Sequence, residues 1–432
     1  MKKVVVLSLT LILILGGCKK NSDNPDKDAR DALYDIMNSW YLWYDKMPAV
    51  NKDDYSNPAD LLEAMRYKTL DKWSFVADYD EFMSEMSGGF VGHGIRIGLD
   101  NANNARIASI YTGSDLYTKG VRRGWIIETI NGTALAPILI AGDQTAYNNL
   151  MGPSTEGITN TFLFKKPDGT EVTLTGTKMS FTVNTVLAAD TLHLTSGITG
   201  YLSFDAFYSS SADELKKAFT YFSTCGCTDV IVDLRYNTGG YVDIAQLLAS
   251  YLLGNNFTDK TFINYKFNNL VGSDNNSSEK FISTSYPMNL TRVVFITSGS
   301  TASASEVVIS SIMPYATVKL VGSKTYGKPC GMNVWQYNYK YVYAPITFEY
   351  TNSNNFGQFY SGLPVDFAAS DDVSHDFGDR NEACLAAAID YLENGTLKSK
   401  AVTGSVNQPE IFREARRQTD NLFINTPQGA GL

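Results

Sequence analysis

The stretch Thr228-Asp229-Val230-Ile231-Val232-Asp233-Leu234 is followed directly by Arg235-Tyr236-Asn237-Thr238-Gly239-Gly240. Its first seven residues are mostly apolar and β-branched, which is typical of a strand buried on both faces of a sheet. The loop that follows is polar and rich in glycine, and a helical run from Ile244 to Ala249 comes next. This order of strand, loop and helix predicts an α/β unit whose loop lies at the end of the strand.

Two further apolar strands are predicted, and each also ends in a polar loop. Val293–Ile296 leads through Ser298–Ala302 to a helical run over Ser303–Ile312, and Val318–Val321 leads into Gly322–Lys328. Open α/β sheets bind their ligands beyond the carboxyl ends of the strands. We therefore expect the three loops to line one pocket.

The predicted pocket contains residues suited to acyl transfer. Ser303 stands at the start of a predicted helix, where free N–H groups and partial positive charge can stabilise an oxyanion. The three histidines, His93, His193 and His375, all lie outside the loops. Lys328 lies in the third loop, and a lysine can act as a base when burial lowers its pKa to about 7–8.

The three loops resemble the signature blocks of the carboxy-terminal processing peptidases, also called tail-specific proteases. The blocks are Asp233–Gly240, Thr301–Glu306 and Val321–Lys328, in the family's order and spacing, and the resemblance covers roughly residues 30 to 395. It implies a serine/lysine dyad, and the 25 residues from Ser303 to Lys328 agree with the family pattern. Ser303 is therefore the predicted nucleophile and Lys328 the predicted base.

The same resemblance implies an α/β core of the crotonase-like class, related to ClpP. It also implies an oxyanion hole formed by the backbone N–H of Ala304 and of a glycine in the Gly239-Gly240 pair. Members often orient the lysine with a glutamine four residues after it. That position here is Met332, and the nearest glutamine is Gln336.

Other polar residues of the blocks have structural interpretations. Ser305 is the alternative serine, but two residues further along the helix it should point elsewhere. Asp233 and Arg235 are expected to pair structurally. Glu306 lies in the first helical turn, where a negative charge interacts favourably with the helix dipole.

A β-rich region before the core resembles a PDZ domain. It opens with the glycine-rich segment Gly88–Gly98, and Gly120–Gly132 follows, with Trp125 where the family usually has Asp. A hairpin is predicted from Phe162–Phe164 and Glu171–Leu174, on either side of a Pro-Asp-Gly turn.

The glycine-rich loop is the candidate peptide-binding site of this region. In PDZ domains such a loop offers backbone N–H groups to a peptide carboxylate, and the peptide adds as a strand. The corresponding residues are Gly92, His93, Gly94 and Ile95. The alternative is that the glycines only shape a turn.

The first part of the folded chain is predicted to be helical. Apolar residues recur at helical spacing from Leu33 to Met47, before Pro48, and a second such segment follows Pro58. Apolar residues at this spacing usually form core, so we interpret residues 29–88 as a small helical domain.

The N-terminus predicts export. Lys2 and Lys3 precede the apolar run Val4–Leu15, which is too short to span a bilayer, and Leu15-Gly16-Gly17-Cys18 follows. Small residues before a cysteine resemble the bacterial lipobox, so Cys18 is the predicted lipidation site, and the protein is expected to be anchored to a bacterial membrane on its periplasmic or surface face. The alternative is an ordinary cleaved signal.

Composition excludes several classes of protein. The chain has 432 residues, roughly three domains by length, and is 44% hydrophobic, which is far from the composition of a disordered chain. It has 36 Lys and Arg against 45 Asp and Glu, without a basic run, so nucleic acid is not an expected partner. Cys225-Gly226-Cys227 has no further ligand at metal-binding spacing, so neither a metal nor a cofactor is expected. The sequence selects no disulfide pairing and no oligomeric state.

The predicted organisation has six segments: a signal peptide (1–17), a tether (18–28), a helical domain (29–88), a PDZ-like domain (89–190), an α/β peptidase domain (191–397) and a tail (398–432). A short helix is expected over Glu410–Arg417 of the tail, without a function. The predicted function is that of an exported, lipid-anchored serine endopeptidase that cleaves peptides or protein C-terminal regions. The alternatives are a catalytically idle peptide-binding scaffold and, from the 26 tyrosines, a glycan-binding lipoprotein.

Overall fold

The apolar run around Val230 forms β12 (Asp229–Asp233), an inner strand of a six-stranded sheet with the order β10-β11-β12-β16-β17-β22. The computed structural model describes residues 25–396, 411–413 and 423–425. β10 is antiparallel to β11, and the other neighbours in this core sheet are parallel. The predicted strands are confirmed. The remaining strands are β10 (Val186–Leu194), β11 (Gly197–Phe204), β16 (Arg292–Thr297), β17 (Thr317–Gly322) and β22 (Phe367–Ala368).

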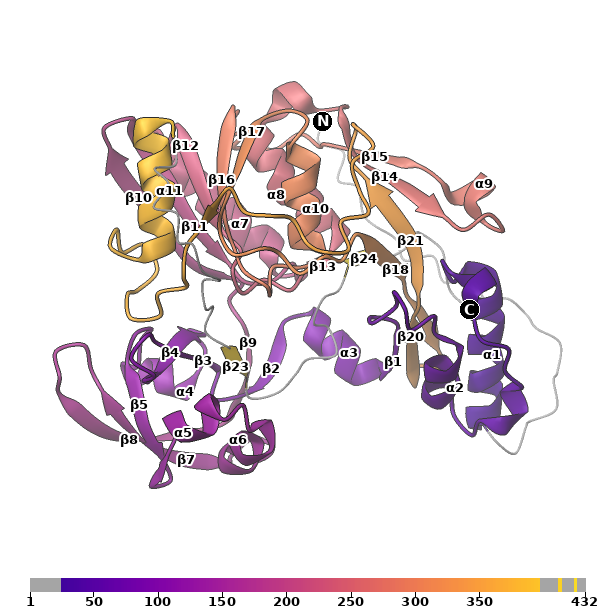
Figure 1. The fold of residues 1–432 in the computed structure, drawn as a ribbon, viewed down its shortest axis with the longest axis horizontal. Coiled ribbons are helices and arrows are strands. Elements are labelled where there is room, and N and C mark those ends of the chain that lie inside the picture. The colour runs from indigo at the N-terminus through magenta and orange to yellow at the C-terminus, as the bar shows by residue number, and fades with distance from the viewer. Residues whose placement is uncertain (1–24, 397–410, 414–422, 426–432) are drawn as a thin grey trace, which may run out of the picture.

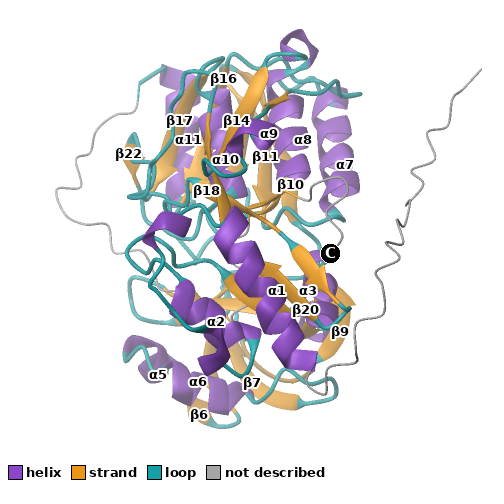
Figure 2. Cartoon of the chain, turned by 90° about the vertical axis from the view of Figure 1, so that its right-hand side faces the viewer, coloured by secondary structure: helices purple, strands orange, loops and turns teal. Residues whose placement is uncertain are grey.

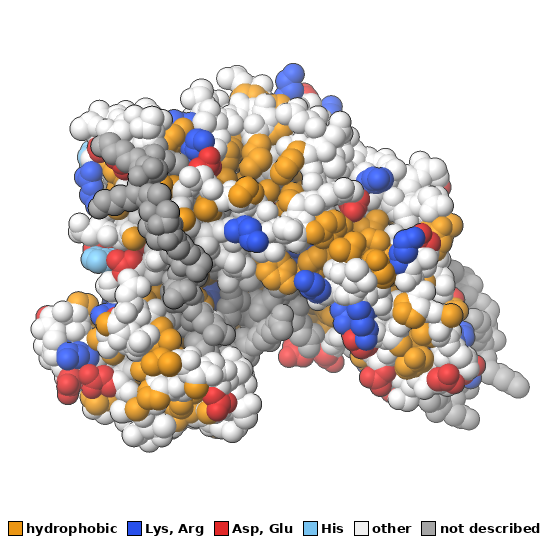
Figure 3. Space-filling view, in the orientation of Figure 1, with side chains coloured by type: hydrophobic (Ala, Val, Ile, Leu, Met, Phe, Trp, Pro, Cys, Tyr) orange, Lys and Arg blue, Asp and Glu red, His pale blue; other side chains and the backbone are white. Residues whose placement is uncertain are grey.

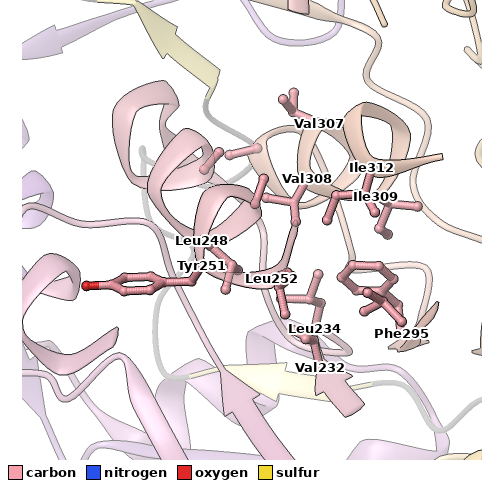
Figure 4. Packing of buried hydrophobic residues seen from close by; sticks show 14 of the residues in the cluster. Val232, Leu234, Leu248, Tyr251, Leu252, Phe295, Val307, Val308, Ile309 and Ile312 are labelled. Atoms are coloured by element: carbon pink, nitrogen blue, oxygen red, sulfur yellow. The ribbon is translucent and has the colours of Figure 1, made fainter. Parts of the chain in front are cut away.

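Helices cover both faces of the core sheet (Figure 1). Successive side chains of a strand point to opposite faces. Val232 therefore packs with α7 (Ser211–Thr224), α8 (Val242–Leu253) and α10 (Ala304–Ile312), whereas Ile231 packs with α11 (Ala383–Asn394). Figure 4 shows Leu248 and Leu252 of α8 beside side chains of α10 and the sheet. The predicted helices after the first and second strands are confirmed.

A second six-stranded sheet has the order β13-β24-β18-β21-β14-β15. It starts at the glycine pair, because β13 contains Gly240, and it includes the strand that follows Lys328 in the sequence. Its strands are β13 (Gly240–Tyr241), β24 (Phe423–Asn425), β18 (Cys330–Asn333), β21 (Ile346–Thr351), β14 (Thr261–Phe267) and β15 (Ser278–Lys280), with η3 (Asn255–Phe257) and α9 (Gly272–Asn275) in the connections.

The N-terminal unit contains α1 (Pro25–Trp40), η1 (Tyr44–Lys46), η2 (Lys52–Asp54), α2 (Pro58–Met65) and α3 (Tyr79–Met86). Figure 2 shows α1 and α2 below β18. The unit is not purely helical, because β1 (Phe75–Asp78) pairs with β20 (Tyr341–Ala344), and β20 pairs with β19 (Trp335–Tyr337). The helical prediction for residues 29–88 is wrong in this respect.

The first helix also differs from the prediction at both ends. It begins at Pro25, inside the predicted tether, and it ends at Trp40 instead of continuing to Met47. Asn38 and Ser39 donate side-chain hydrogen bonds to carbonyls four residues earlier, and Leu42 donates its N–H to the carbonyl of Ile346, 2.9 Å away. A tertiary hydrogen bond therefore takes the place of the next helical turn.

The β-rich unit lies beside the core in Figure 1, and Figure 3 shows an indentation between it and the N-terminal unit. The predicted hairpin is confirmed as β7 (Thr159–Lys165) and β8 (Glu171–Thr177). The predicted end at residue 190 is too late, because β10 already pairs with β11 of the core sheet from Val186. The other elements are β2 (Gly89–Gly92), β3 (Ile95–Leu99), β4 (Ala105–Ile110), α4 (Asp115–Thr118), β5 (Ile126–Ile130), β6 (Thr133–Ala134), α5 (Ala136–Ile140), α6 (Gln144–Met151) and β9 (Met179–Thr182).

Two strands come from the predicted tail. The helix expected over Glu410–Arg417 is wrong, because β23 (Ile411–Arg413) pairs with β3 of the β-rich unit. β24 lies in the second sheet. The predicted signal peptide and Cys18 lie outside the described residues. Within those residues, no helix is long and apolar enough to cross a membrane.

Candidate active site

The loop after β12 is shaped by its glycine pair. Gly239 and Gly240 have φ values of 112° and 141°. A Cβ on Gly240 would lie 2.3 Å from the carbonyl oxygen of Phe207, so only glycine fits there. The N–H of Gly239 donates to Oδ1 of Asn237, 2.9 Å away. This bond uses one of the two predicted glycine donors, and Gly240 becomes the better candidate for the oxyanion hole.

Ser303 occupies a strained position at the start of α10. Its φ and ψ are 62° and −116°, and non-glycine residues with positive φ are uncommon. The residue is fully buried, and its Oγ has no hydrogen-bond partner among the described residues. Strained residues and buried unsatisfied polar atoms concentrate at functional sites. These features fit the nucleophile that the sequence predicts.

Lys328 lies in the loop between β17 and β18 and is also fully buried. Burial lowers its pKa to about 8, and the nearby Cys330, Asp71 and Glu306 partly oppose this shift. Its Nζ lies 5.7 Å from the centroid of the Trp73 ring. An amine with this pKa is neutral in about one tenth of the molecules at pH 7, far more often than a solvated lysine, and only the neutral form can act as a general base.

The carboxylate of Glu306 joins the serine loop to the lysine loop. Its Oε2 accepts the backbone N–H of Ser303 and that of Lys328, each at 2.9 Å. The two backbone nitrogens are therefore at most twice this distance, 5.8 Å, apart. Its Oε1 accepts the Thr325 hydroxyl at 2.5 Å and the Gly327 N–H at 2.7 Å.

Glu306 thus does more than the predicted favourable interaction with the helix dipole. Burial raises the pKa of Glu306, and the four hydrogen bonds that it accepts oppose this shift. The role in joining two loops was missed because it depends on a contact between segments about 20 residues apart. The structure brings Ser303 and Lys328 together through this one side chain.

The neighbours of Ser303 in α10 have distinct roles. The alternative nucleophile, Ser305, donates its hydroxyl to the carbonyl of Asn237, 3.1 Å away. This hydrogen bond gives it a structural role. Ala304 is the first residue of α10, and the N–H groups of a first helical turn have no acceptor within the helix. Its N–H is therefore suited to binding an oxyanion.

The residues considered for orienting Lys328 do not have that geometry. Met332 is buried in β18, and Oε1 of Gln336 accepts the N–H of Tyr339 in a turn. Trp73 and Asp71 of the N-terminal unit lie near the lysine instead. Asp71 accepts the hydroxyl of Tyr41 at 2.8 Å. Sequence reasoning missed both residues, because nothing in their local pattern points to the third loop.

The predicted pairing of Asp233 with Arg235 is confirmed and is part of a larger buried cluster. Arg235 also binds Asp371 and Glu382, at 2.7 and 2.8 Å. Arg123 of the β-rich unit reaches Asp371 at 3.0 Å. The cluster thus holds the base of the glycine loop and links it to the β-rich unit.

The glycine-rich loop of the β-rich unit lies between two strands. Gly92 ends β2, Gly94 has a φ of 69°, and Ile95 begins β3. The side chain of His93 points inward, with its Nε2 2.7 Å from Oδ1 of Asn160. Burial lowers the pKa of His93 to about 4. Any contact of His93 with a peptide must therefore use its backbone.

The cysteines and acidic residues form neither a disulfide nor a metal-ligand cluster in the part of the chain that the structure describes. Cys225, Cys227, Cys330 and Cys384 are free thiols. No group of three or more histidine, cysteine or acidic side chains there could hold a metal ion.

Comparison with known proteins adds independent findings. The model of peptidase family S41 matches residues 198–366, and that of the S41 N-terminal domain matches residues 28–75. A "Probable CtpA-like serine protease" of Staphylococcus saprophyticus is 26% identical over 253 residues, which are 57% of this chain and 46% of the relative. One of the same name from Staphylococcus aureus strain MRSA252 is 25% identical over 316 residues, 71% of this chain and 57% of the relative. The chain spans about half the length of these curated relatives.

A solved structure shows the same fold. It is that of a Bacteroides fragilis protein assigned to the S41 proteases, with a TM-score of 0.70 and 22% identity. The match covers 84% of this chain and 97% of the other. The first matched segment contains the glycine loop, Ser303 and Lys328, and the second contains Trp73. From the two family models that match it, this chain belongs to peptidase family S41.

Proposed function

We propose that this chain is a serine peptidase in which Ser303 is the nucleophile and Lys328 the general base. The observation that carries the proposal is the Glu306 oxygen that binds the backbone N–H of both residues at 2.9 Å. The buried hydroxyl of Ser303 and the lowered pKa of Lys328 support it further.

The reaction is acyl transfer through an ester. Neutral Lys328 takes the proton from Oγ of Ser303 as Oγ bonds to the carbonyl carbon of the peptide. The protonated lysine gives this proton to the leaving amine when the C–N bond breaks. Lys328, neutral again, then takes a proton from water as the water oxygen attacks the ester carbonyl. Lys328 returns this proton to Oγ of Ser303 when the ester C–O bond breaks and the acid is released.

The oxyanion formed in each step needs donors that are already in place. We assign this role to the N–H groups of Ala304 and Gly240. Backbone donors at the start of a helix cost no reorganisation when the charge develops, and removing one such donor typically lowers kcat by about 10²–10³-fold.

We extend the proposal to the fold class and the substrate. The mostly parallel core sheet with helices on both faces fits a crotonase-like core. The loop Gly92–Ile95, which enters a strand of the β-rich unit, fits a PDZ-like module that binds extended peptides. The proposed substrates are peptides or C-terminal regions of proteins.

The proposed location follows from the first 18 residues. We propose export and a lipid anchor on Cys18, on the periplasmic or surface face of a bacterial membrane. Incorporation of labelled fatty acid into the expressed chain, compared with a Cys18→Ser variant, tests the anchor. Equal labelling of both would refute it.

Substitution of the dyad tests the activity. Ser303→Ala and Lys328→Ala should each lower kcat for a fluorogenic peptide by about 10³-fold or more, because each removes a group that acts in the chemical step. Ser305→Ala is the matched control, because the Ser305 hydroxyl donates to the backbone carbonyl of Asn237 and has no role in the proposed reaction. This variant should retain activity. A serine-reactive probe should label Ser303 alone.

Two outcomes would contradict the proposal. Turnover that persists in Ser303→Ala would exclude this nucleophile. A native chain that binds peptides but neither cleaves them nor reacts with the probe would favour the scaffold alternative.

A further inference from the structure

The C-terminal segment of the chain contributes a strand to the β-rich unit. β23 (Ile411–Arg413) runs antiparallel to β3, with Ile411 opposite Gly98 and Arg413 opposite Arg96. β3 is the strand that follows the Gly92–Gly94 loop. An extended peptide that adds to a sheet edge binds in this manner, mainly through its main chain. The tail therefore occupies the edge at which the proposed peptide-binding module would take its ligand.

The same segment contributes a second strand to the sheet that contains β13 and β18 (Figure 1). β24 (Phe423–Asn425) lies between β13 and β18 and is parallel to both. Phe423 is opposite Gly240, and Ile424 is opposite Met332. β13 contains the predicted oxyanion glycine, and β18 begins two residues after Lys328. The position of β24 is therefore bordered on both sides by parts of the candidate active site.

The direction of the Gly240 N–H supports this placement. Tyr241 donates its N–H to the carbonyl of Phe207 at 2.8 Å, and the N–H of Phe207 donates to the carbonyl of Gly239 at 3.0 Å. Successive N–H groups of a strand point to opposite edges. The N–H of Gly240 therefore points away from Phe207 and toward the edge where β24 lies.

The side chain of Ile424 shows that β24 is packed and not merely adjacent. It is 2% exposed and belongs to a cluster that includes Cys330, Met332 and Ile346. At the other contact, a Cβ on Gly98 would lie 2.9 Å from Cδ1 of Ile411. Both strands of the segment thus have side-chain contacts as well as backbone pairing.

We propose that the strands β23 and β24 act in cis as a built-in competitor for substrate, bound at both peptide-binding surfaces. The inference rests on the proposed function, because it assigns these two strand positions to substrate. A peptide on the same chain has an effective concentration on the order of millimolar. A strand with only weak affinity for its site would therefore be bound most of the time. A substrate peptide can take the position of β23 at the edge of β3, or the position of β24 between β13 and β18, only after that strand has left.

Cleavage of the folded chain between β23 and β24 tests the proposal. A site for a sequence-specific protease is inserted between residues 413 and 423, and the full chain is cut after folding and then diluted. We expect KM for a fluorogenic peptide to fall at least tenfold with kcat unchanged, because a tethered competitor blocks only the free enzyme. A synthetic peptide with the sequence of residues 418–428 should restore the original KM competitively.

Substitutions in the uncut chain provide a second measurement. Ile424→Asp places a charge in the buried cluster and should release β24, so that KM falls as it does after cutting. Ile424→Val is the matched control and should leave KM close to that of the native chain. An unchanged KM after cutting, or a loss of activity that the added peptide does not reverse, would overturn the proposal, because β24 would then be a permanent part of the sheet.

A binding assay separates this inference from the proposed function. In the Ser303→Ala background, the labelled peptide of residues 418–428 should bind the cut and diluted protein at least tenfold more tightly than the uncut protein. If the cut protein binds the peptide more tightly while the native chain cleaves nothing, the peptidase proposal fails, but the inference that β24 occupies a peptide-binding position still holds. If the native chain is active but both forms bind the peptide equally, only the built-in competitor is refuted.

Discussion

Replacing Trp73 with alanine should reveal how Lys328 is kept neutral. The indole is 5.7 Å from Nζ, and burial lowers the pKa of Lys328 from 10.5 to about 8. Removing the ring admits water and should raise this pKa, an effect larger than the loss of a cation–π contact of about 0.5–2 kcal/mol. At pH 7 the neutral fraction is about one tenth for a pKa of 8, and each unit of increase lowers it about tenfold.

These values set the expected size and the pH dependence of the effect. A complete return of the pKa to 10.5 would lower kcat/KM at pH 7 by about 300-fold, so we expect a loss between about tenfold and this limit. The loss should shrink to about twofold or less at pH 10.5, where the amine is neutral in at least about half of the molecules of either protein. The native profile should rise with pH and level off above about pH 8, because only the neutral amine is a base.

The assay is kcat/KM for a fluorogenic peptide from pH 6 to 10.5. Trp43→Ala is the matched control, since Trp43 is also a half-buried ring of the N-terminal unit and contacts Tyr41 and Tyr67. Cys330, Asp71 and Glu306 are titratable groups whose charges raise the pKa of Lys328 against the effect of burial. An equal loss at every pH, or an inflection that stays near pH 8 in Trp73→Ala, would refute the reasoning.

Two further predictions concern the buried charges. Glu306→Gln places an amide NH2 group next to four hydrogen-bond donors that the carboxylate now accepts. The free energy of unfolding measured with urea should therefore fall by about 2–4 kcal/mol, and kcat should also fall. Equal stability of the variant and the native chain would contradict the role given to this carboxylate. Arg235→Met leaves the carboxylates of Asp233, Asp371 and Glu382 without their shared cation, so urea unfolding should show a loss of about 3–5 kcal/mol, and a change below 1 kcal/mol would contradict a cooperative cluster.

The core of the molecule could be predicted from the sequence because its signals are local. The β-branched run around Val230 and the two later runs specify strands buried on both faces, and each becomes a parallel strand of one sheet. The loops that follow such strands must meet at the carboxyl edge of the sheet. The proximity of Ser303 and Lys328 follows from this rule, whereas the shared carboxylate of Glu306 does not.

The parts that sequence reasoning missed depend on contacts between distant segments. Trp73 comes near Lys328 because β1 pairs with β20, a register that no local pattern encodes. The first helix ends at Trp40 because Leu42 binds a carbonyl about 300 residues further along the chain. β23 and β24 have three residues each, which is too short for the alternation of apolar and polar residues in a strand to be recognised. In addition, β23 lies within the polar run Glu410–Arg417, which the sequence predicts to be a helix.

These distant contacts bear on how the proposed dyad would work. Lys328 can be a base at neutral pH only while its surroundings are dry, and the residues that exclude water come from the N-terminal unit and from the strands beside it. β24 packs on the cluster that contains Cys330, two residues from the lysine. When β24 leaves, water enters that position unless another extended peptide takes it. A bound substrate would therefore restore the dry environment that lowers the pKa of Lys328, and the empty site would hold a lysine that is more often protonated. On this reasoning the tail competes with substrate, and the substrate itself completes the conditions for the base.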